Sequence, residues 1–262
     1  TSNNLYKTFL NTLEQNIVIE DLTEEKVRME EVAKLKSDFF ASMSHEIRTP
    51  LNGVVGLVEL LIETKIDRTQ KDYLTTIRKS SDDLLNIIND VLDLSKIESD
   101  KLELIPKKTN LPDFLKRMIV LFSQRAKDKN INLRLTLDDD LPNYIFFDEH
   151  RLSQITTNLL SNAIKFTPKG GHISISTKEK IINNKRMIET EIRDTGVGIT
   201  EENMSKLFQI EQNYNSKGTN NESGTGLGLI LCKEFINQND GNIRVESELT
   251  VGSSFIFDLE CT

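Results

Sequence analysis

An apolar stripe in the segment 74–95 constrains the fold more than any other feature of this sequence. Its members recur at alternating steps of three and four, which places them on one helix face: Leu74, Ile77, Ser81, Leu84, Ile88, Val91 and Ser95. Upstream, a second apolar stripe has steps of three, three and four, also a helical spacing: Met29, Val32, Leu35 and Phe39. Two helices joined by the polar segment 66–69 cannot bury both stripes alone. The pattern therefore predicts a helical hairpin that pairs with a second copy, as a homodimer, into a four-helix bundle.

The first helix of this hairpin should continue to about Glu63 and must accommodate Pro50, which removes one backbone hydrogen bond and usually kinks a helix. Asp21 and Glu24 have the spacing of a helix-start cap. Before them, apolar residues step by four through the segment 5–17, another helical spacing. Whether that segment belongs to the same helix is left open by the pattern.

Beyond Ser99 the sequence changes to a mixed α and β texture. Alternating apolar residues predict strands at 101–105, 131–137, 173–178, 187–192, 241–247 and 252–259. Amphipathic periodicity predicts helices at 111–128, 149–166, 201–208 and 227–238, with Asp148 as a cap for the second of them. The implied architecture is a mixed sheet with helices on one face, an α/β sandwich, following the helical hairpin.

Charge and hydropathy exclude several classes of protein. The 33 Lys and Arg against 41 Asp and Glu give a formal net charge of −8, spread along the chain, which argues against a nucleic-acid groove. No apolar run approaches the roughly 20 residues that cross a bilayer. The two cysteines have no metal-ligand spacing and fit a reducing compartment. Because the chain begins at Thr1 without a methionine, we expect the cytoplasmic piece of a larger protein, attached to a membrane only through an upstream segment.

Three polar side chains share one face of the expected helix 149–166. Asn158, Asn162 and Lys165 fall at i, i+4 and i+7, opposite the apolar positions. An amide oxygen can ligate Mg²⁺ and an ammonium can meet phosphate oxygens, so the face suits a metal-bound polyphosphate. Taken by itself, the helix is more typical of a solvated surface.

A carboxylate ends the apolar face of the next expected strand. Alternation places Ile188, Thr190, Ile192 and Asp194 on one side of the sheet, where a carboxylate is costly without a partner. One interpretation is a turn-capping aspartate. The functional interpretation is that Asp194 accepts a hydrogen bond from an adenine amino group, with Gly196 and Gly198 allowing the base close to the backbone.

A glycine-rich stretch opens the last expected helix, and glycines before a helix N-terminus favour phosphate binding. It reads Gly224, Thr225, Gly226, Leu227, Gly228 and Leu229. Its G-x-G-x-G spacing follows a polar loop instead of a strand, so it is not a dinucleotide-binding fingerprint. The polar loop itself, 209–223, is long enough to predict a lid over a nucleotide.

The order of these motifs resembles the ATP-binding fold shared by gyrase, Hsp90, MutL and histidine kinases. Upstream, the segment 44–52 reads Ser-His-Glu-Ile-Arg-Thr-Pro-Leu-Asn. With it, the sequence resembles a sensor histidine kinase of a two-component system over about 36–259. The resemblance implies three parts: a signalling helix at 1–35, a dimerisation and histidine phosphotransfer domain at 36–100, and a catalytic ATP-binding domain at 101–262.

The same resemblance implies roles for individual residues. His45 would be the phosphoacceptor and Glu46 the acid/base group that takes its proton. Asn158 would hold Mg²⁺, Asn162 and Lys165 the phosphates of ATP, and Asp194 adenine. The glycine motifs, including Gly196, Gly198 and positions 224–228, would shape the pocket and the lid. The family often has a second phenylalanine shortly after Phe208, where this chain has Gln209, Ile210 and Glu211, so the lid packing departs from the pattern.

The implied activity is autophosphorylation of His45 from ATP, followed by transfer to an aspartate of a response regulator receiver domain. Thr49, one turn after His45, could orient water for a phosphatase reaction on that partner, or bond back to a backbone carbonyl before Pro50. Two rival functions stay open: a gyrase- or Hsp90-like ATPase clamp, which leaves the His45 segment unexplained, and a catalytically inactive dimeric scaffold, against which the complete ATP motifs argue.

Overall fold

The computed structural model describes residues 2–99, 101–182, 184–209, 218–219 and 226–260, without the side chains of 2–18, 20–22, 24 and 30. The chain divides into two compact units, Thr1–Leu102 and Glu103–Thr262. Each unit is described by itself below. Among the described residues, no helix combines the length and apolar character needed to span a membrane.

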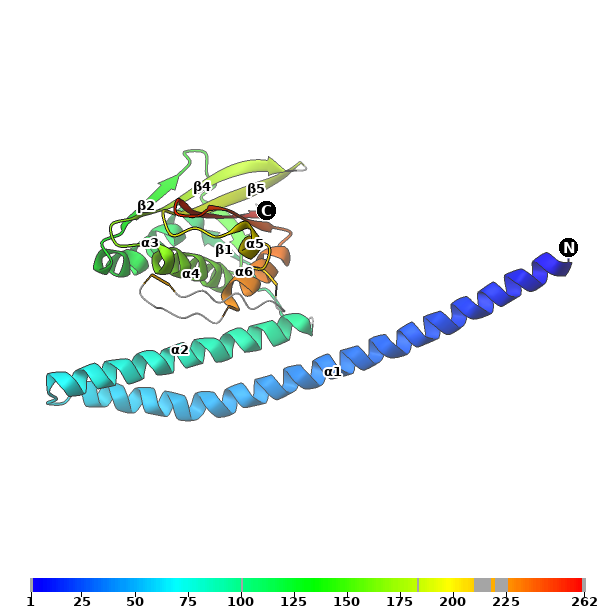
Figure 1. Cartoon of the computed structure of the whole chain (residues 1–262), viewed down its shortest axis with the longest axis horizontal. Helices are drawn as coiled ribbons and strands as arrows, with labels where there is room; N and C mark the ends of the chain where they lie inside the picture. Colours follow the sequence, from blue (N-terminus) through cyan, green and yellow to red (C-terminus); the bar gives the residue numbers. More distant parts are fainter. Residues whose placement is uncertain (1, 100, 183, 210–217, 220–225, 261–262) are drawn as a thin grey trace. The chain divides into compact units, whose positions relative to one another are not determined.

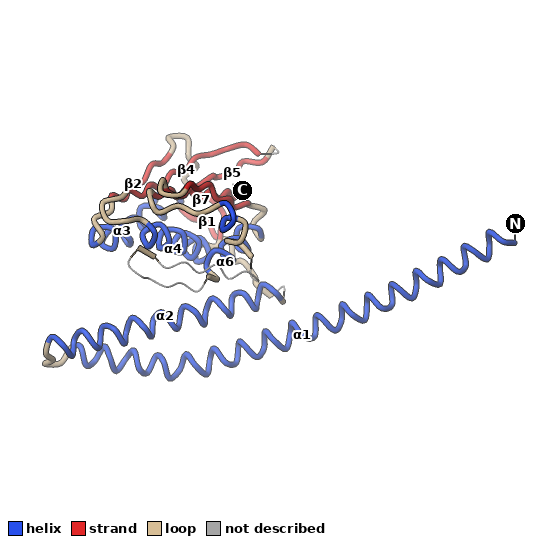
Figure 2. The backbone as a smooth tube through the Cα atoms, in the orientation of Figure 1, coloured by secondary structure: helices blue, strands red, loops and turns tan. Residues whose placement is uncertain are grey.

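The first unit is an antiparallel helical hairpin (Figures 1 and 2). Helix α1 covers Ser2–Ile62 and continues through Pro50. Helix α2 covers Arg68–Glu98 and begins with a capping box, in which Asp67 accepts from the Gln70 N–H at 2.8 Å and the Gln70 side chain accepts from the Asp67 N–H at 2.9 Å. Because α1 is uninterrupted, the predicted helix start at Asp21 is wrong.

Polar pairs fix the register of the two helices. Near the open end of the hairpin, Lys36 Nζ lies 2.6 Å from Glu98 Oε2. One turn past His45, Arg48 donates to Asn89 Oδ1 at 3.0 Å. Both lysine and glutamate of the first pair are substantially exposed, so this pair adds little stability. Its consequence is geometric, since together these contacts place the His45 turn of α1 beside the second half of α2.

The predicted apolar stripe of α2 is divided between two environments. Its serines, Ser81 and Ser95, are buried in the hairpin. The larger members Ile77 and Leu84 stay 44% and 43% exposed. On α1, apolar side chains are exposed in the same way, among them Phe39, Leu57 and Leu60. A single hairpin therefore buries mainly small residues, with Val58 of α1, and leaves many of its bulky apolar side chains exposed.

The second unit is a five-stranded mixed sheet in the order β2-β4-β5-β7-β6. Strands β2 and β4 are parallel and all other neighbours are antiparallel. The strands are β2 (Asn132–Leu137), β4 (His172–Ile182), β5 (Lys185–Asp194), β6 (Asn242–Glu248) and β7 (Gly252–Glu260). The helices are α3 (Leu111–Asp128), α4 (Glu149–Phe166), α5 (Glu201–Met204) and α6 (Gly228–Asn237). Helices α3, α4 and α6 cover one face of the sheet (Figures 1 and 2), as predicted.

Two expected elements differ from the observed ones. The predicted strand 101–105 is wrong, since the chain becomes a strand only at β1 (Lys107–Asn110), which pairs with β3 (Tyr144–Phe147). The sequence did not reveal β3. Both strands have four residues, and a local pattern that short is not distinctive, because the pairing between them decides the conformation. The helix predicted at 201–208 is also shorter, ending at Met204.

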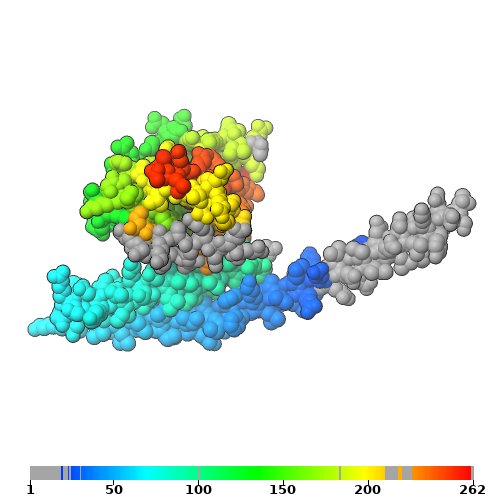
Figure 3. Space-filling model, viewed as in Figure 1, coloured from blue at the N-terminus to red at the C-terminus, as the bar shows by residue number. Residues whose placement is uncertain are grey.

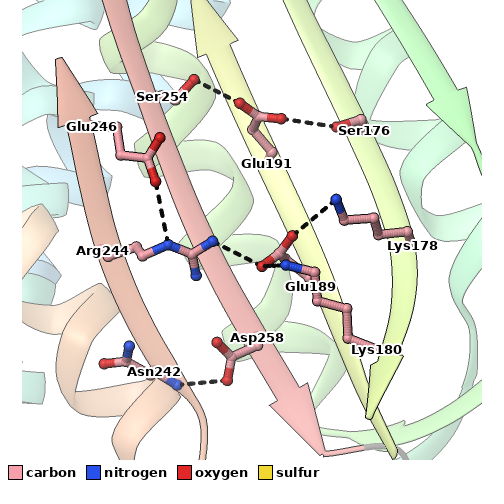
Figure 4. Close-up of polar contacts among 10 residues, drawn as sticks. All are labelled: Ser176, Lys178, Lys180, Glu189, Glu191, Asn242, Arg244, Glu246, Ser254 and Asp258. Atoms are coloured by element: carbon pink, nitrogen blue, oxygen red, sulfur yellow. Dashed lines mark hydrogen bonds and ion pairs between the residues drawn. The ribbon is translucent and has the colours of Figure 1, made fainter. Parts of the chain in front are cut away.

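The sheet face away from the helices is a charged network (Figure 4). Its centre is Glu189, whose side chain is only 6% exposed and which lies 2.6 Å from Lys180 Nζ, 2.9 Å from Arg244 Nη2 and 3.4 Å from Lys178 Nζ. Beside it, Glu191 accepts from Ser254 Oγ at 2.7 Å. On this face the buried Glu189 carboxylate is thus paired with cations from β4 and β6, while the opposite face packs apolar side chains against the helices.

Candidate functional site

Helix α4 carries the central polar stripe of the second unit. It starts at Asp148, whose Oδ1 accepts from the N–H groups of His150 and Arg151 at 3.0 and 3.3 Å, a helix N-cap. The apolar face is fully buried against the sheet and includes Leu152, Ile155, Leu159 and Ala163. The three polar side chains of the stripe, Asn158, Asn162 and Lys165, are half-buried. Amphipathic packing therefore fixes which side of α4 they occupy.

Asn158 joins α4 to the glycine-rich start of α6. Its Nδ2 donates to the Gly228 carbonyl oxygen at 3.2 Å and contacts the Cys232 sulfur at 3.8 Å. Because the amide nitrogen serves the protein backbone, Oδ1 is the atom through which Asn158 can serve a ligand. This contact brings together two motifs that are seventy residues apart in the chain.

Asp194 ends β5 as a buried carboxylate. It is 5% exposed, and its Oδ1 accepts from the Gly196 N–H at 2.7 Å. Burial raises the pKa of Asp194 to about 6, although backbone N–H groups of Gly196 and Ser253 oppose the rise. The buried carboxylate keeps lone pairs that can accept further hydrogen bonds, but it has little contact with water. It is consequently a strong acceptor for a donor group on a bound ligand.

Two positions after Asp194 require glycine, because neighbouring atoms leave no room for a side chain and, at Gly198, because φ is also positive. A Cβ at Gly196 would lie 2.5 Å from Asp194 Oδ1 and 2.7 Å from the Phe166 carbonyl oxygen. Gly198 has φ +72, and a Cβ there would lie 2.0 Å from the Glu248 carbonyl oxygen. Side chains at these positions would displace the loop from β5 and from the β6–β7 turn.

This glycine loop is tied to neighbouring segments on both sides. The Val197 N–H donates to the Phe166 carbonyl oxygen at 3.3 Å, at the end of α4, and the Val197 carbonyl oxygen accepts from Thr250 at 2.8 Å. In the space-filling view the segment after β5 (yellow) lies beside the β6–β7 turn (red) (Figure 3). The carboxylate, the loop and the last turn of α4 therefore form one connected region.

Part of the predicted phosphate loop lies outside the described residues, namely Gly224 and Thr225, as does most of the predicted lid. Gly226, Leu227 and Gly228 are described and half-buried, and α6 begins at Gly228. At the far end of α4, Lys165 Nζ lies 4.7 Å from the centre of the Phe166 ring. The roles of these residues and of Asn162 toward phosphate stay predictions.

The second predicted constellation lies on α1, in the first unit. His45 and Glu46 are exposed, and Ser44 beside them is buried at 3% exposure. The Thr49 hydroxyl donates to the His45 carbonyl oxygen at 3.1 Å. This contact is the one expected if Thr49 bonds back to a backbone carbonyl. The imidazole of His45 is therefore accessible to a reactant that approaches from solvent.

Two residues near the site gave no sequence signal. Lys129 and Thr219 both contact the last turn of α4, although one follows α3 and the other precedes α6. Lys129 belongs to no motif, and nothing distinguishes Thr219 from its neighbours in the predicted lid 209–223, since an isolated lysine or threonine in a polar segment is usually a surface residue. Only their proximity to the end of α4 reveals them.

Fold and site together define a class of protein: an ATPase-type α/β domain of the gyrase and Hsp90 kind, attached to a helical hairpin that displays a histidine. Sequence families agree with both parts. The family described as histidine kinase-, DNA gyrase B-, and HSP90-like ATPase matches residues 147–262, and the His Kinase A (phospho-acceptor) domain family matches residues 35–100. The chain belongs to the histidine kinase family, as a sensor histidine kinase.

Individual relatives are consistent with this membership. The signal transduction histidine-protein kinase BarA of Escherichia coli K12 is 42% identical over 249 residues, which is 95% of this chain and 27% of BarA. The sensor protein GacS of Pseudomonas syringae pv. syringae is 39% identical over 252 residues, 96% of this chain and 28% of GacS. The crystal structure of full-length ShkA in complex with AMPPNP is 32% identical, with a TM-score of 0.71, over 87% of this chain and 46% of ShkA. The chain therefore spans about a quarter of the length of these two curated relatives.

Proposed function

We propose that the protein is an autophosphorylating protein histidine kinase that transfers the γ-phosphoryl group of ATP to His45. The observation that carries the proposal is the buried Asp194 carboxylate beside a glycine loop, in a chain whose other unit exposes His45. ShkA, which shares this fold, is described in complex with an ATP analogue. The proposal accounts for both units, because an ATP-binding domain supplies a phosphoryl group and the histidine of the other unit accepts it.

In this proposal Asp194 binds the adenine end of the nucleotide. Its ionised carboxylate accepts from the exocyclic amino group, and Gly196, which has no side chain, lets the loop stay close to that carboxylate. The phosphates lie toward the polar stripe of α4, where Asn162 and Lys165 donate to them. Gly224, Thr225, Gly226, Leu227 and Gly228 supply backbone N–H groups at the start of α6.

Mg²⁺ fits the donor set that the structure provides. With its Nδ2 committed to Gly228, Asn158 has Oδ1 to offer as a ligand. Among the described residues, no group of three or more His, Cys, Asp or Glu could hold a metal ion. We therefore assign one protein ligand, Asn158, since Mg²⁺ commonly takes its other ligands from substrate phosphates and water. When bound, the ion supplies positive charge to the transferring phosphoryl oxygens.

At the acceptor, one ring nitrogen of His45 forms the bond to the γ-phosphorus as the bond from phosphorus to the ADP oxygen breaks. The neutral form of an imidazole has a nitrogen lone pair, which is what lets a histidine act as a nucleophile. Glu46 takes the proton that the phosphorylated ring would otherwise retain. Because Glu46 is adjacent in sequence, it points about 100° away around the helix and must curl back to reach the ring.

The proposed assembly and partners follow from the first unit. Its uncovered apolar side chains fit a homodimeric four-helix bundle. The phosphoryl group on His45 then passes to an aspartate of a response regulator receiver domain, in the cytoplasm where ATP is supplied. We propose segment 1–35 as the signalling helix, 36–100 as the dimerisation and phosphotransfer domain, and 101–262 as the catalytic domain.

Incubation with γ-labelled ATP and Mg²⁺ tests the proposal. We expect a label on the protein that acid removes and alkali does not, and that is absent from His45→Gln. Matched controls are His150→Gln and His172→Gln, which change the other two histidines, both exposed. ATP hydrolysis without a label would instead identify a clamp-type ATPase, and neither label nor hydrolysis would identify a scaffold. A label retained in His45→Gln would reject His45 as the acceptor.

A further inference from the structure

The C-terminal turn of α4 is held by three segments that are distant in sequence. A helix leaves its last carbonyl groups without partners inside the helix. Here the Ala163 oxygen accepts from the Thr167 hydroxyl at 2.6 Å, and the Phe166 oxygen accepts from Val197 N–H at 3.3 Å. The two carbonyl oxygens between them, those of residues 164 and 165, accept hydrogen bonds from Lys129, and that of residue 165 also accepts from Thr219.

Lys129 makes three hydrogen bonds at this turn. Its Nζ donates to the carbonyl oxygens of Ile164 and Lys165 at 2.8 and 2.9 Å, and to the Thr219 hydroxyl oxygen at 2.6 Å. An ammonium has three protons, so these three acceptors match its donor capacity. A positive charge at a helix C-terminus also interacts favourably with the helix dipole. Lys129 is the C-cap residue of α3, so it links α3 to the end of α4.

Thr219 completes the contact from the segment between α5 and α6. Its N–H and its hydroxyl reach the Lys165 carbonyl oxygen at 3.1 and 3.0 Å, and its hydroxyl lies 3.4 Å from the Thr167 carbonyl oxygen. The hydroxyl therefore accepts from Lys129 while it donates its single proton to the end of α4. Gly218, just before it, is buried. This is a specific anchor, because serine could replace the hydroxyl but valine, of the same shape, could not.

We propose that Lys129 and Thr219 are positioning residues for ATP: their hydrogen bonds to the last carbonyl groups of α4 fix its last turn, and with it Lys165. Neither residue touches the nucleotide in this proposal. Their effect passes through the backbone of residue 165, to which both bond, and through Phe166, which holds the loop after Asp194. The inference rests on the proposed function, since it assigns these residues to the same nucleotide site.

The test compares Thr219→Val, which removes only the hydroxyl, with Thr219→Ser, which keeps it, in the full chain. We expect Thr219→Val to raise the Kd for ADP with Mg²⁺ and the KM for ATP about five- to tenfold, as the loss of one hydrogen bond predicts. Thr219→Ser should stay within about twofold of wild type on the same reasoning. Lys129→Met should resemble Thr219→Val, and the double variant should be no worse than the worse single variant, because both act through one contact.

Lys127→Met is the matched control for lost charge, since Lys127 lies exposed on the last turn of α3. Calorimetric melting without nucleotide separates positioning from unfolding: Thr219→Val should lower nucleotide affinity at temperatures well below the melting transition of its second unit, where the variant is folded. Equal affinity in Thr219→Val and wild type overturns the inference, as does an affinity loss shared by Lys127→Met. If wild type binds no ADP, the proposed function itself fails, which distinguishes the two failures.

Discussion

Replacing Asp194 by asparagine should stabilise the second unit and at the same time remove nucleotide binding. Asparagine keeps the shape of the side chain, and its Oδ1 can still accept from the Gly196 N–H. It removes a negative charge from a residue that is 5% exposed. It also presents an NH₂ group, or an already occupied oxygen, to the adenine amino group, so the acceptor that adenine needs is lost.

The size of the stabilisation follows from the pKa. Burial raises the pKa of Asp194 from 3.8 to about 6, so at neutral pH the ionised carboxylate costs about 3 kcal/mol in the folded state relative to the unfolded state. Asparagine avoids this cost but weakens one of the hydrogen bonds from Gly196 and Ser253, a loss of about 1 kcal/mol. We expect a net gain of about 1 to 3 kcal/mol at pH 7.5.

The pH dependence identifies the cause. A raised folded-state pKa contributes stability that is complete below 3.8 and disappears as the pH rises through about 6. Wild type should therefore approach the Asp194→Asn variant in stability as the pH falls from 7 to 4. Over the same range wild type should lose affinity for ADP, because protonation removes the ionised acceptor.

Differential scanning calorimetry between pH 4 and 8 measures both effects. The transition of the second unit is the one that a nonhydrolysable ATP analogue shifts upward in wild type, and Asp194→Asn should show no such shift. The exposed Asp140→Asn is the control for loss of charge alone. An Asp194→Asn protein that is less stable than wild type at pH 7.5, or a stability difference that does not change with pH, would refute the reasoning.

Three further predictions concern other parts of the molecule. Gly198→Ala should destabilise the second unit by about 2 to 5 kcal/mol in urea titrations, since φ is +72 and the new Cβ meets the Glu248 carbonyl oxygen. Burial alone would raise the pKa of Glu189, but hydrogen bonds from Lys180 and Arg244 outweigh this effect and lower the pKa to about 2. Glu189→Gln should therefore reduce the free energy of unfolding by about 1 to 3 kcal/mol at pH 7. The difference from wild type should shrink as the pH falls below 4.5 in matched urea titrations. Thr49→Val, which removes the bond to the His45 carbonyl, should keep labelling of His45 by γ-labelled ATP; loss of the label would assign Thr49 to the forward reaction.

Local patterns predicted the longer elements well. Helices α3 and α4 have the bounds expected from their amphipathic spacing, and Asp148 caps α4 as predicted. Alternation along β5 correctly placed Ile188, Thr190 and Ile192 with Asp194 on the buried face. In each case the signal lies within one segment, where helical or strand periodicity directly decides which side chains face the core.

Pairing between distant segments was not predictable in the same way. The sequence missed β3 and misplaced β1, because each is only four residues long and is stabilised by the other. Nor did the sequence reveal that Glu189 on β5 is buried, because the cations that surround and neutralise it come from β4 and β6. It also gave the α2 stripe one environment, whereas Ser81 and Ser95 alone are small enough to be buried at the contact with α1.

The sequence by itself determined which residues were candidates: a histidine segment, an Asn and Lys stripe, a strand-ending aspartate and two glycine motifs. Only the tertiary structure decided which of these residues contact one another and which other residues join them. It placed Asn158 on Gly228, joined the Asp194 loop to the end of α4, and brought Lys129 and Thr219 to the same turn. The reason is physical: periodicity is set by neighbours along the chain, whereas these contacts satisfy buried polar groups at helix ends, and the partners come from whichever segments the packed core brings close.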